Sequence, residues 1–270
     1  MTEVPLANLK WQRVAESVAN HLRDQILSGE LQDGDLLPKE DVLRATYPVS
    51  KPSLREAMRI LETEGLISIR RGNMGGALVH RPEAANVAYT LALVLRSRNS
   101  GTLAVAKALQ ECEPACAALC AERKDRKRAV LPKLRSLQRE SIASVSDLVS
   151  ATTASRRFHE AVVQLCGNEP LTVIVGALEA LWSSHETDWA HQVSDTDLVP
   201  IDERQDALDI HAEMIDLIAD GEAERVRELS ALHLQFVQHY PAEVATSVRV
   251  DRKVGAPIDP MLVRLQLNGE

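Results

Sequence analysis

Apolar residues recur at helical spacing in the first part of the chain. Between Trp11 and Ser28 they lie three or four positions apart, which predicts an amphipathic helix, and Gly29 ends it. A second short helix is predicted to open at Pro38 and to end near Thr46. The first helix carries its apolar stripe at Val14, Val18, Leu22, Ile26 and Leu27.

The segment VSKPSLREAMRILETEG, residues 49–65, predicts a third helix. Ser50 can cap its start, and Pro52 is tolerated in its first turn. One face is apolar and must pack inward, so a basic stripe beside it is expected to remain free. The apolar face consists of Leu54, Ala57, Met58 and Leu61. The basic stripe consists of Lys51, Arg55 and Arg59.

After Gly65 the spacing of apolar residues changes from helical to alternating. Alternation in LISIRRG and ALVHR, on either side of NMGG, predicts two short strands joined by a glycine-rich turn. Three helices and a hairpin with cations on both indicate a winged helix-turn-helix, which lays one helix in the major groove. A solvated charged face is the alternative interpretation of three cations, but the neighbouring helices and the hairpin favour DNA. The predicted DNA-binding residues are Lys39, Ser50, Lys51, Ser53, Arg55, Arg59, Arg70, Arg71 and Gly72.

The rest of the chain keeps helical spacing and lacks strand alternation. We therefore predict a mostly α protein, with an N-terminal winged helix-turn-helix carrying a small β-hairpin wing and a C-terminal all-α helical bundle. The expected domains are residues 8–81 for DNA binding, 82–245 for effector binding and dimerisation, and 246–270 as a C-terminal tail. The predicted helices of the bundle are 84–95, 103–122, 130–144, 146–166, 171–190, 202–220 and 222–239.

Charge is divided unevenly between these parts. Residues 1–81 carry eleven basic and eleven acidic side chains, so the net charge of −8 comes from the remainder. DNA would repel that acidic remainder, so contact is expected through a local basic face of the first part. The first ten residues lack the apolar core of a signal peptide, and the longest apolar run, residues 87–95, is too short to span a bilayer. We expect a cytoplasmic protein without a membrane partner.

Three histidines stand out in the bundle region as candidate metal ligands. His159, His211 and His233 fall on three predicted helices, and neutral imidazoles that meet in one interior can hold a divalent transition metal with positions open for another ligand. A lone histidine on a helix is more often an ordinary core or surface residue. Three cysteines lie four residues apart, and buried small thiols are favoured over a metal cluster. These cysteines are Cys112, Cys116 and Cys120.

The N-terminal motifs resemble the DNA-binding domain of the GntR family of bacterial repressors. The resemblance rests on GELQDGDLLPKEDVL, VSKPSLREAMRILETEGLI and RRGNMGGALV and covers about residues 11–81. Two positions depart from the family pattern. Lys51 stands where the recognition helix usually begins with arginine. A guanidinium that can bind an acceptor through two N–H groups is thus replaced by an ammonium group, which acts as a point charge. Asp41 stands where many members have an arginine, which removes an expected phosphate contact.

The later part is similar to the FCD effector domain of the FadR branch of this family. The similarity rests on FHEAVVQLCGNEPL and on the spacing of the later histidines. It implies a metal, such as zinc or nickel, held by one aspartate and three histidines beside a carboxylate effector. His159, His211 and His233 match the histidines, whereas Ser155 replaces the aspartate and Leu109 a common arginine. The implied effector site is therefore Ser155 with the three histidines, and Ser155 or water completes the metal shell.

These observations predict a ligand-responsive transcriptional regulator, a repressor that binds a palindromic DNA operator as a homodimer. A small-molecule effector in the bundle would shift the spacing of the two winged domains. A metal-dependent hydrolytic enzyme is the alternative, since a three-histidine site can activate water. Against it, FHEAVVQ lacks the second histidine of a His-Glu-x-x-His motif. A DNA-binding protein without an effector is a third interpretation, which a ligand that stabilises the bundle and releases DNA would exclude.

Overall fold

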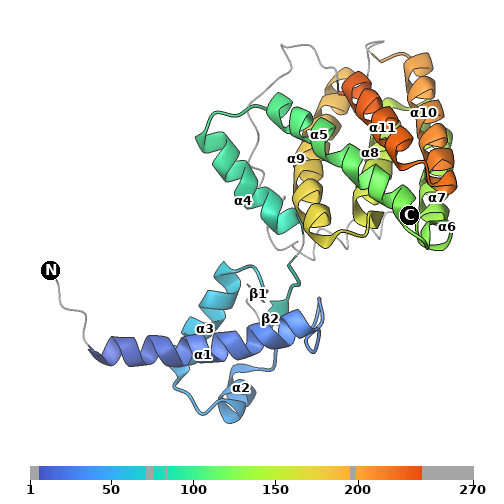
Figure 1. The fold of residues 1–270 in the computed structure, drawn as a ribbon. Coiled ribbons are helices and arrows are strands. Elements are labelled where there is room, and N and C mark those ends of the chain that lie inside the picture. Colours follow the sequence, from blue (N-terminus) through green and yellow to red (C-terminus); the bar gives the residue numbers. More distant parts are fainter. Residues whose placement is uncertain (1–5, 71–75, 83, 195–198, 239–270) are drawn as a thin grey trace. The chain divides into compact units, whose positions relative to one another are not determined.

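The computed structural model of the protein describes residues 6–70, 76–82, 84–194 and 199–238. The described residues up to Pro82 and those from Ala84 onward form two compact units, which Figure 1 shows in blue to cyan and in green to red. Each unit has its own apolar core. The first is a helical unit with a two-stranded sheet and the second is all helical, which confirms the predicted fold class.

The first unit contains the three predicted helices and the hairpin. Gly29 ends the first helix with a φ of +83°, a left-handed conformation that glycine adopts without steric cost. The strands pair antiparallel, with Ile67 opposite Val79 and Arg70 opposite Gly76. The elements are α1 (Leu6–Ser28), α2 (Glu40–Thr46), α3 (Lys51–Thr63), β1 (Ile67–Arg70) and β2 (Gly76–Val79).

The core of the first unit lies between α1, α3 and the hairpin. α3 packs on α1, on α2 and on β1, so one face of this helix is committed to the core. Leu54, Ala57 and Leu61 are buried as the helical spacing predicted, and Leu22 and Ile26 of α1 are buried with them. The opposite face of α3 therefore carries the polar side chains that are available to a partner.

The second unit is a bundle whose helices follow the predicted segments closely. A four-residue helix, α6, is the one addition, and it was not predicted because four residues are too few to show a period. The helices are α4 (Ala84–Ser97), α5 (Thr102–Glu122), α6 (Arg126–Ala129), α7 (Leu131–Ser144), α8 (Leu148–Leu165), α9 (Glu169–Val193), α10 (Ile201–Asp220) and α11 (Ala223–Val237).

Helix α5 runs through the middle of the bundle (Figure 1). It packs along α11 and also contacts α8, α9 and α10, so most of its length is inside the core. Cys116 and Cys120 of α5 are fully buried, and Cys112 is half-buried. Burial raises the pKa of both the Cys116 and the Cys120 thiol, which keeps them protonated and agrees with the prediction of packed small thiols.

A membrane-spanning helix would have to be both long and strongly apolar. Among the described residues, the model contains no helix that meets both conditions.

Candidate DNA-binding face and effector site

Helix α3 begins at a capped turn. The Ser50 hydroxyl oxygen accepts a hydrogen bond from the backbone N–H of Ser53 at 3.3 Å, and Pro52 occupies the first turn. Ser53 differs from the prediction that its side chain meets DNA. It is only 5% exposed, and its hydroxyl lies 2.9 Å from that of Ser50, so it belongs to the cap of the helix.

The basic stripe of α3 is exposed but already engaged in ion pairs. The Lys51, Arg55 and Arg59 side chains are 51, 68 and 74% exposed. Glu40 of α2 lies 2.9 Å from Lys51 Nζ and 3.5 Å from Arg55 Nε, and Glu56 lies 3.0 Å from Arg59 Nη2. The stripe therefore lies on the surface, as the helical spacing predicted, but its cations are paired with carboxylates that the spacing did not predict. Helical spacing could not reveal Glu40, because it belongs to the preceding helix.

The remaining predicted DNA-binding residues are divided between surface and undescribed positions. Lys39 precedes α2 and is exposed, and Arg70 is exposed at the end of β1. Arg71 and Gly72 lie outside the described residues. The structure therefore brings Lys51, Arg55 and Arg59 together on one helix, with Lys39 before the neighbouring helix and Arg70 on the hairpin.

The three predicted histidines meet in the interior of the second unit. They come from α8, α10 and α11 and are at most 1% exposed. His211 Nε2 lies 3.3 Å from His159 Nε2 and 2.9 Å from His233 Nε2, and one nitrogen from each ring lies within 4.8 Å of the others. A zinc ion with bonds of about 2.0–2.1 Å in tetrahedral geometry holds two nitrogens about 3.3–3.4 Å apart. Two of the three nitrogen–nitrogen distances are therefore close to those that such an ion requires.

All three rings are neutral at pH 7. Burial lowers the pKa of His159 to about 3, and burial also lowers the pKa values of His211 and His233 well below the ordinary 6.5. Neutral imidazole is the form that binds a metal. The 2.9 Å contact also suits a hydrogen bond from one neutral ring to another when no metal is present.

Glu113 of α5 holds the other side of His159. Its Oε1 atom lies 2.5 Å from His159 Nδ1, and both side chains are fully buried. When the Nδ1–H group donates a hydrogen bond to this carboxylate, the Nε2 lone pair is free for a metal. Within the described part of the chain, Nδ1 of His211 and Nδ1 of His233 have no hydrogen-bond partner. His159 is thus the histidine whose orientation is fixed by a carboxylate.

A buried group of charges continues from Glu113. Burial raises the pKa of Glu179 well above its ordinary value, and the Glu179 and Glu113 side chains interact through a hydrogen bond. Arg156 of α8 lies 3.4 Å from Glu179 through Nη1, and its Nε lies 2.6 Å from Glu186. Arg156 is therefore neutralised by protein carboxylates, as buried charges generally are.

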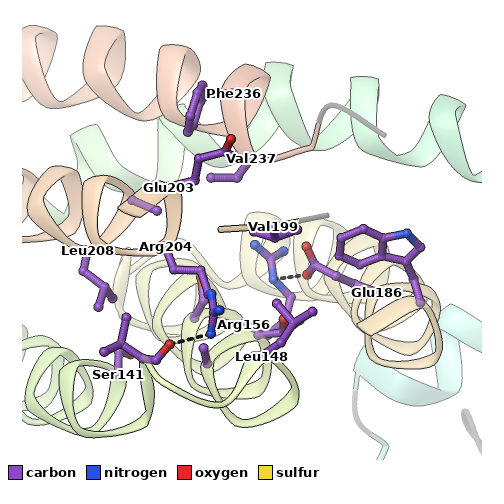
Figure 2. A pocket seen from close by; sticks show the side chains of 16 residues that line it. Ser141, Leu148, Arg156, Glu186, Val199, Glu203, Arg204, Leu208, Phe236 and Val237 are labelled. Atoms are coloured by element: carbon purple, nitrogen blue, oxygen red, sulfur yellow. Dashed lines mark hydrogen bonds and ion pairs between the residues drawn. The ribbon is translucent and has the colours of Figure 1, made fainter. Parts of the chain in front are cut away.

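A cavity of about 270 Å³ lies beside this group (Figure 2). Ser155 and Arg156 of α8 line it together with Glu186 and Trp189 of α9. Arg204 enters it from α10, and Figure 2 shows both arginines at the cavity with Glu186 beside Arg156. Its other walls are Ser141, Val145, Leu148, Ala151, Thr152, Val199, Glu203, Ala207, Leu208, Phe236 and Val237.

Two departures from the family pattern have clear places in the structure. Ser155 is half-buried at the cavity, one helical turn before His159, so its hydroxyl stands where the resemblance places a carboxylate. Leu109 is fully buried among the apolar side chains of the core, one helical turn before Glu113 on α5. Sequence reasoning did not place Glu113 or Arg156 and missed Glu186 and Arg204. Their burial is a tertiary property, so the sequence offered no signal that separated them from the other charged residues of the helical segments.

Comparisons with known proteins agree with both parts of this description. Residues 14–76 match the family described as bacterial regulatory proteins, gntR family, and residues 104–236 match the FCD domain. The HTH-type transcriptional regulator YcbG of Bacillus subtilis is 26% identical over 230 residues, which cover 83% of this chain and 88% of YcbG.

The transcriptional repressor NanR aligns over shorter stretches. NanR of Cronobacter sakazakii is 29% identical over 178 residues, 64% of this chain and 65% of that protein. NanR of Klebsiella aerogenes is 39% identical over 83 residues, 31% of this chain and 30% of that protein. These alignments thus span less than two thirds of the NanR chains.

A solved structure has the same fold. Streptococcus agalactiae GntR superposes with a TM-score of 0.60 at 21% identity, covering 83% of this chain and 98% of that one. The family matches are to regulators, so the alternative of a hydrolytic enzyme is set aside. Glu113 agrees with this, since it binds the far side of the His159 ring and cannot act as a base on water at Nε2. The chain belongs to the GntR family of bacterial regulatory proteins and carries an FCD domain behind its DNA-binding domain.

Proposed function

We propose that this DNA-binding regulator is a homodimeric repressor that acts in the cytoplasm on a palindromic operator. In this proposal a small organic acid binds in the helical unit and lowers the affinity for DNA. The exposed cations of α3 are the observation that carries the DNA-binding half. The cavity lined by Ser155 and Arg156 supports the effector half, since both belong to the helix that carries His159, although none of the three histidines is among the described residues that line it.

The ion pairs of α3 are compatible with DNA binding. Exposed pairs contribute only about 0–1 kcal/mol, so a phosphate or a base edge can replace Glu40 or Glu56 at little cost. Arg55 is the best placed cation, because its contact with Glu40 is long at 3.5 Å and its side chain is 68% exposed. If DNA displaces Glu40, the freed carboxylate stays close to the DNA phosphates and is repelled by them. Binding is therefore expected to be strongest at DNA sites where both Lys51 and Arg55 find acceptors.

Two observations support a dimer. Winged helix-turn-helix proteins read two half-sites by placing two copies on a two-fold axis. The second unit also exposes aliphatic side chains on α4 and α9, which pack on each other. These exposed side chains are Val87, Leu93, Val94, Val173 and Ile174. Such side chains at 40–57% exposure suit a surface that a second copy covers.

A divalent metal such as zinc or nickel fits the three histidines and completes the proposed effector site. His159, His211 and His233 would hold it, and Ser155 or water would take a further position. A bound metal supplies a cation that attracts the carboxylate of an effector. The effector then shifts the population of DNA-binding conformations only as far as its affinity for the two conformations differs.

The DNA-binding half is tested by selection of an operator from random duplex DNA, followed by fluorescence anisotropy with the selected sequence. Arg55→Ala should weaken specific binding by at least about tenfold, because a hydrogen bond to a charged group contributes about 1.5–3 kcal/mol. Arg135→Ala removes the same charge from an exposed position on α7 and serves as the matched control. Operator affinity equal to that of the unmodified protein in Arg55→Ala would contradict the proposal.

A further inference from the structure

Arg204 lies in the first turn of α10 and reaches the cavity wall. Its Nη1 donates a hydrogen bond of 2.6 Å to the carbonyl oxygen of Val145, which follows the last residue of α7. A cation at the C-terminal end of a helix is favourable, so this contact holds the guanidinium in one place. The arginine is therefore positioned by the protein before any ligand arrives.

The hydrogen-bonding capacity of Arg204 is only partly used. A guanidinium has five N–H donors, and the buried Nε of Arg204 has no hydrogen-bond partner among the described residues. No described carboxylate forms an ion pair with Arg204, although Glu203 lines the same cavity and Asp147 interacts with its charge at longer range. A buried donor without a partner is costly, and an anion that enters the cavity would remove that cost.

Arg156 differs from Arg204 in this respect. Its Nε lies 2.6 Å from Glu186 and its Nη1 lies 3.4 Å from Glu179, so protein carboxylates take up its charge. Two guanidinium groups line the cavity (Figure 2), and among the described residues only that of Arg156 forms ion pairs with carboxylates, so Arg204 is the better candidate to bind an anion.

The remaining walls define the rest of the ligand. Thr152 and Ser155 place two hydroxyl groups on one face of α8, and Ser155 lies one turn from His159. Leu148, Trp189 and Val199 form an apolar wall. A volume of about 270 Å³ is close to the lower limit of ordinary ligand pockets, about 300 Å³, and suits a metabolite rather than a long acyl chain.

We propose that Arg204 binds the anionic group of a small hydroxylated organic acid, whose hydroxyl groups extend along Thr152 and Ser155 toward the three histidines. This inference rests on the proposed effector function of the cavity and specifies the chemistry of the ligand. The arginine selects the acid over its neutral analogue, because only the acid satisfies the buried donor and the positive charge together.

The test uses the full-length protein and isothermal titration calorimetry with matched acid and neutral probes. The probe pairs are D-glucuronate with D-glucose and D-glycerate with glycerol. At least one acid should bind about tenfold or more tightly than its neutral partner, and Arg204→Gln should weaken that acid at least about tenfold. Arg225→Gln on an exposed position of α11 should leave the affinity unchanged.

Three results would overturn the proposal: no acid binds, a neutral probe binds as tightly as its acid, or folded Arg204→Gln keeps full affinity. The comparison of acid with neutral probe on the unmodified protein remains decisive if Arg204→Gln does not fold. Operator release is measured separately by anisotropy. If an acid binds through Arg204 but does not release DNA, the proposed regulatory function is wrong and the proposed acid site stands. If a neutral probe releases DNA, the regulatory function stands and the proposed acid site is contradicted.

Discussion

The three histidines of the second unit are not equivalent at the level of single residues. Glu113 contacts Nδ1 of His159, whereas Nδ1 of His211 and Nδ1 of His233 have no hydrogen-bond partner among the described residues. A carboxylate behind a metal-binding histidine fixes its tautomer and makes the ring a stronger ligand. Glu113 is therefore a positioning residue for any metal at this site.

We expect Glu113→Gln to weaken zinc binding by roughly 10–100-fold, the usual cost of losing such a partner. The amide can still accept a hydrogen bond from Nδ1, so the change mainly removes negative charge. Affinity is measured by competition with a chromophoric chelator, and far-UV circular dichroism checks the fold. Glu111→Gln, an exposed change on the same helix, is the control. Equal zinc affinity in both variants would show that Glu113 does not assist the metal site.

At the scale of single elements, α3 shows how local sequence prepares a binding surface. Ser50 caps the helix, Pro52 enters its first turn, and the buried Leu54, Ala57 and Leu61 turn the basic side chains outward. The helix periodicity predicted this orientation correctly. It could not predict that Glu40 of α2 pairs with Lys51 and Arg55, because the approach of two helices is a tertiary property.

Ser50→Ala should destabilise the first unit by about 1 kcal/mol, since it removes the side-chain acceptor for the Ser53 N–H. Urea unfolding of the unit, followed by circular dichroism, measures the loss. Ser28→Ala is the comparison, because its hydroxyl donates to the Gln25 carbonyl at the end of α1 and caps no N–H group. A similar small change in both variants would mean that the cap contributes little.

At the scale of the whole molecule, the second unit contains three buried histidines in the neutral form. Their pKa values are lowered by burial, so the unfolded chain binds more protons than the folded chain as pH falls. The stability they contribute is complete above the unfolded pKa of about 6.5 and is lost as pH falls below it toward the folded values.

For metal-free protein, we expect the unfolding free energy of the second unit to decrease from pH 7 to pH 5. Each histidine accounts for up to about 2 kcal/mol over this interval. Chemical unfolding at a series of pH values measures the slope, and His233→Gln should reduce it by one proton. His191→Gln, an exposed change on α9, should leave the slope as it is. A slope that is flat below pH 6.5 would show that the rings are not buried in the neutral form.

Zinc should act on the second unit alone. Because the three ligands all belong to that unit, an ion bound only by the folded state raises its unfolding free energy by about 2.7 kcal/mol at one hundred times the dissociation constant. Differential scanning calorimetry with and without zinc would detect the shift. His211→Ala should abolish it, and a shift that persists in this variant would place the ion elsewhere.

The sequence by itself determined the helices, the hairpin and the division into a DNA-binding part and a helical part. Helix periodicity and turn residues are local properties of the chain. For this reason α3 and the seven longer helices of the second unit could be predicted from the sequence alone. The sequence also identified the three histidines and the departures at Ser155 and Leu109, through resemblance to the family.

Only the tertiary structure decided which charges meet. Glu113 and His159 are 46 positions apart, and Arg204 and Val145 are 59 positions apart. No spacing rule connects residues on different helices, because their approach depends on how the helices pack. For the same reason the sequence did not predict that Ser53 is part of a cap, that Glu40 pairs with Lys51 and Arg55, or that Arg204 lines a cavity together with Ser155.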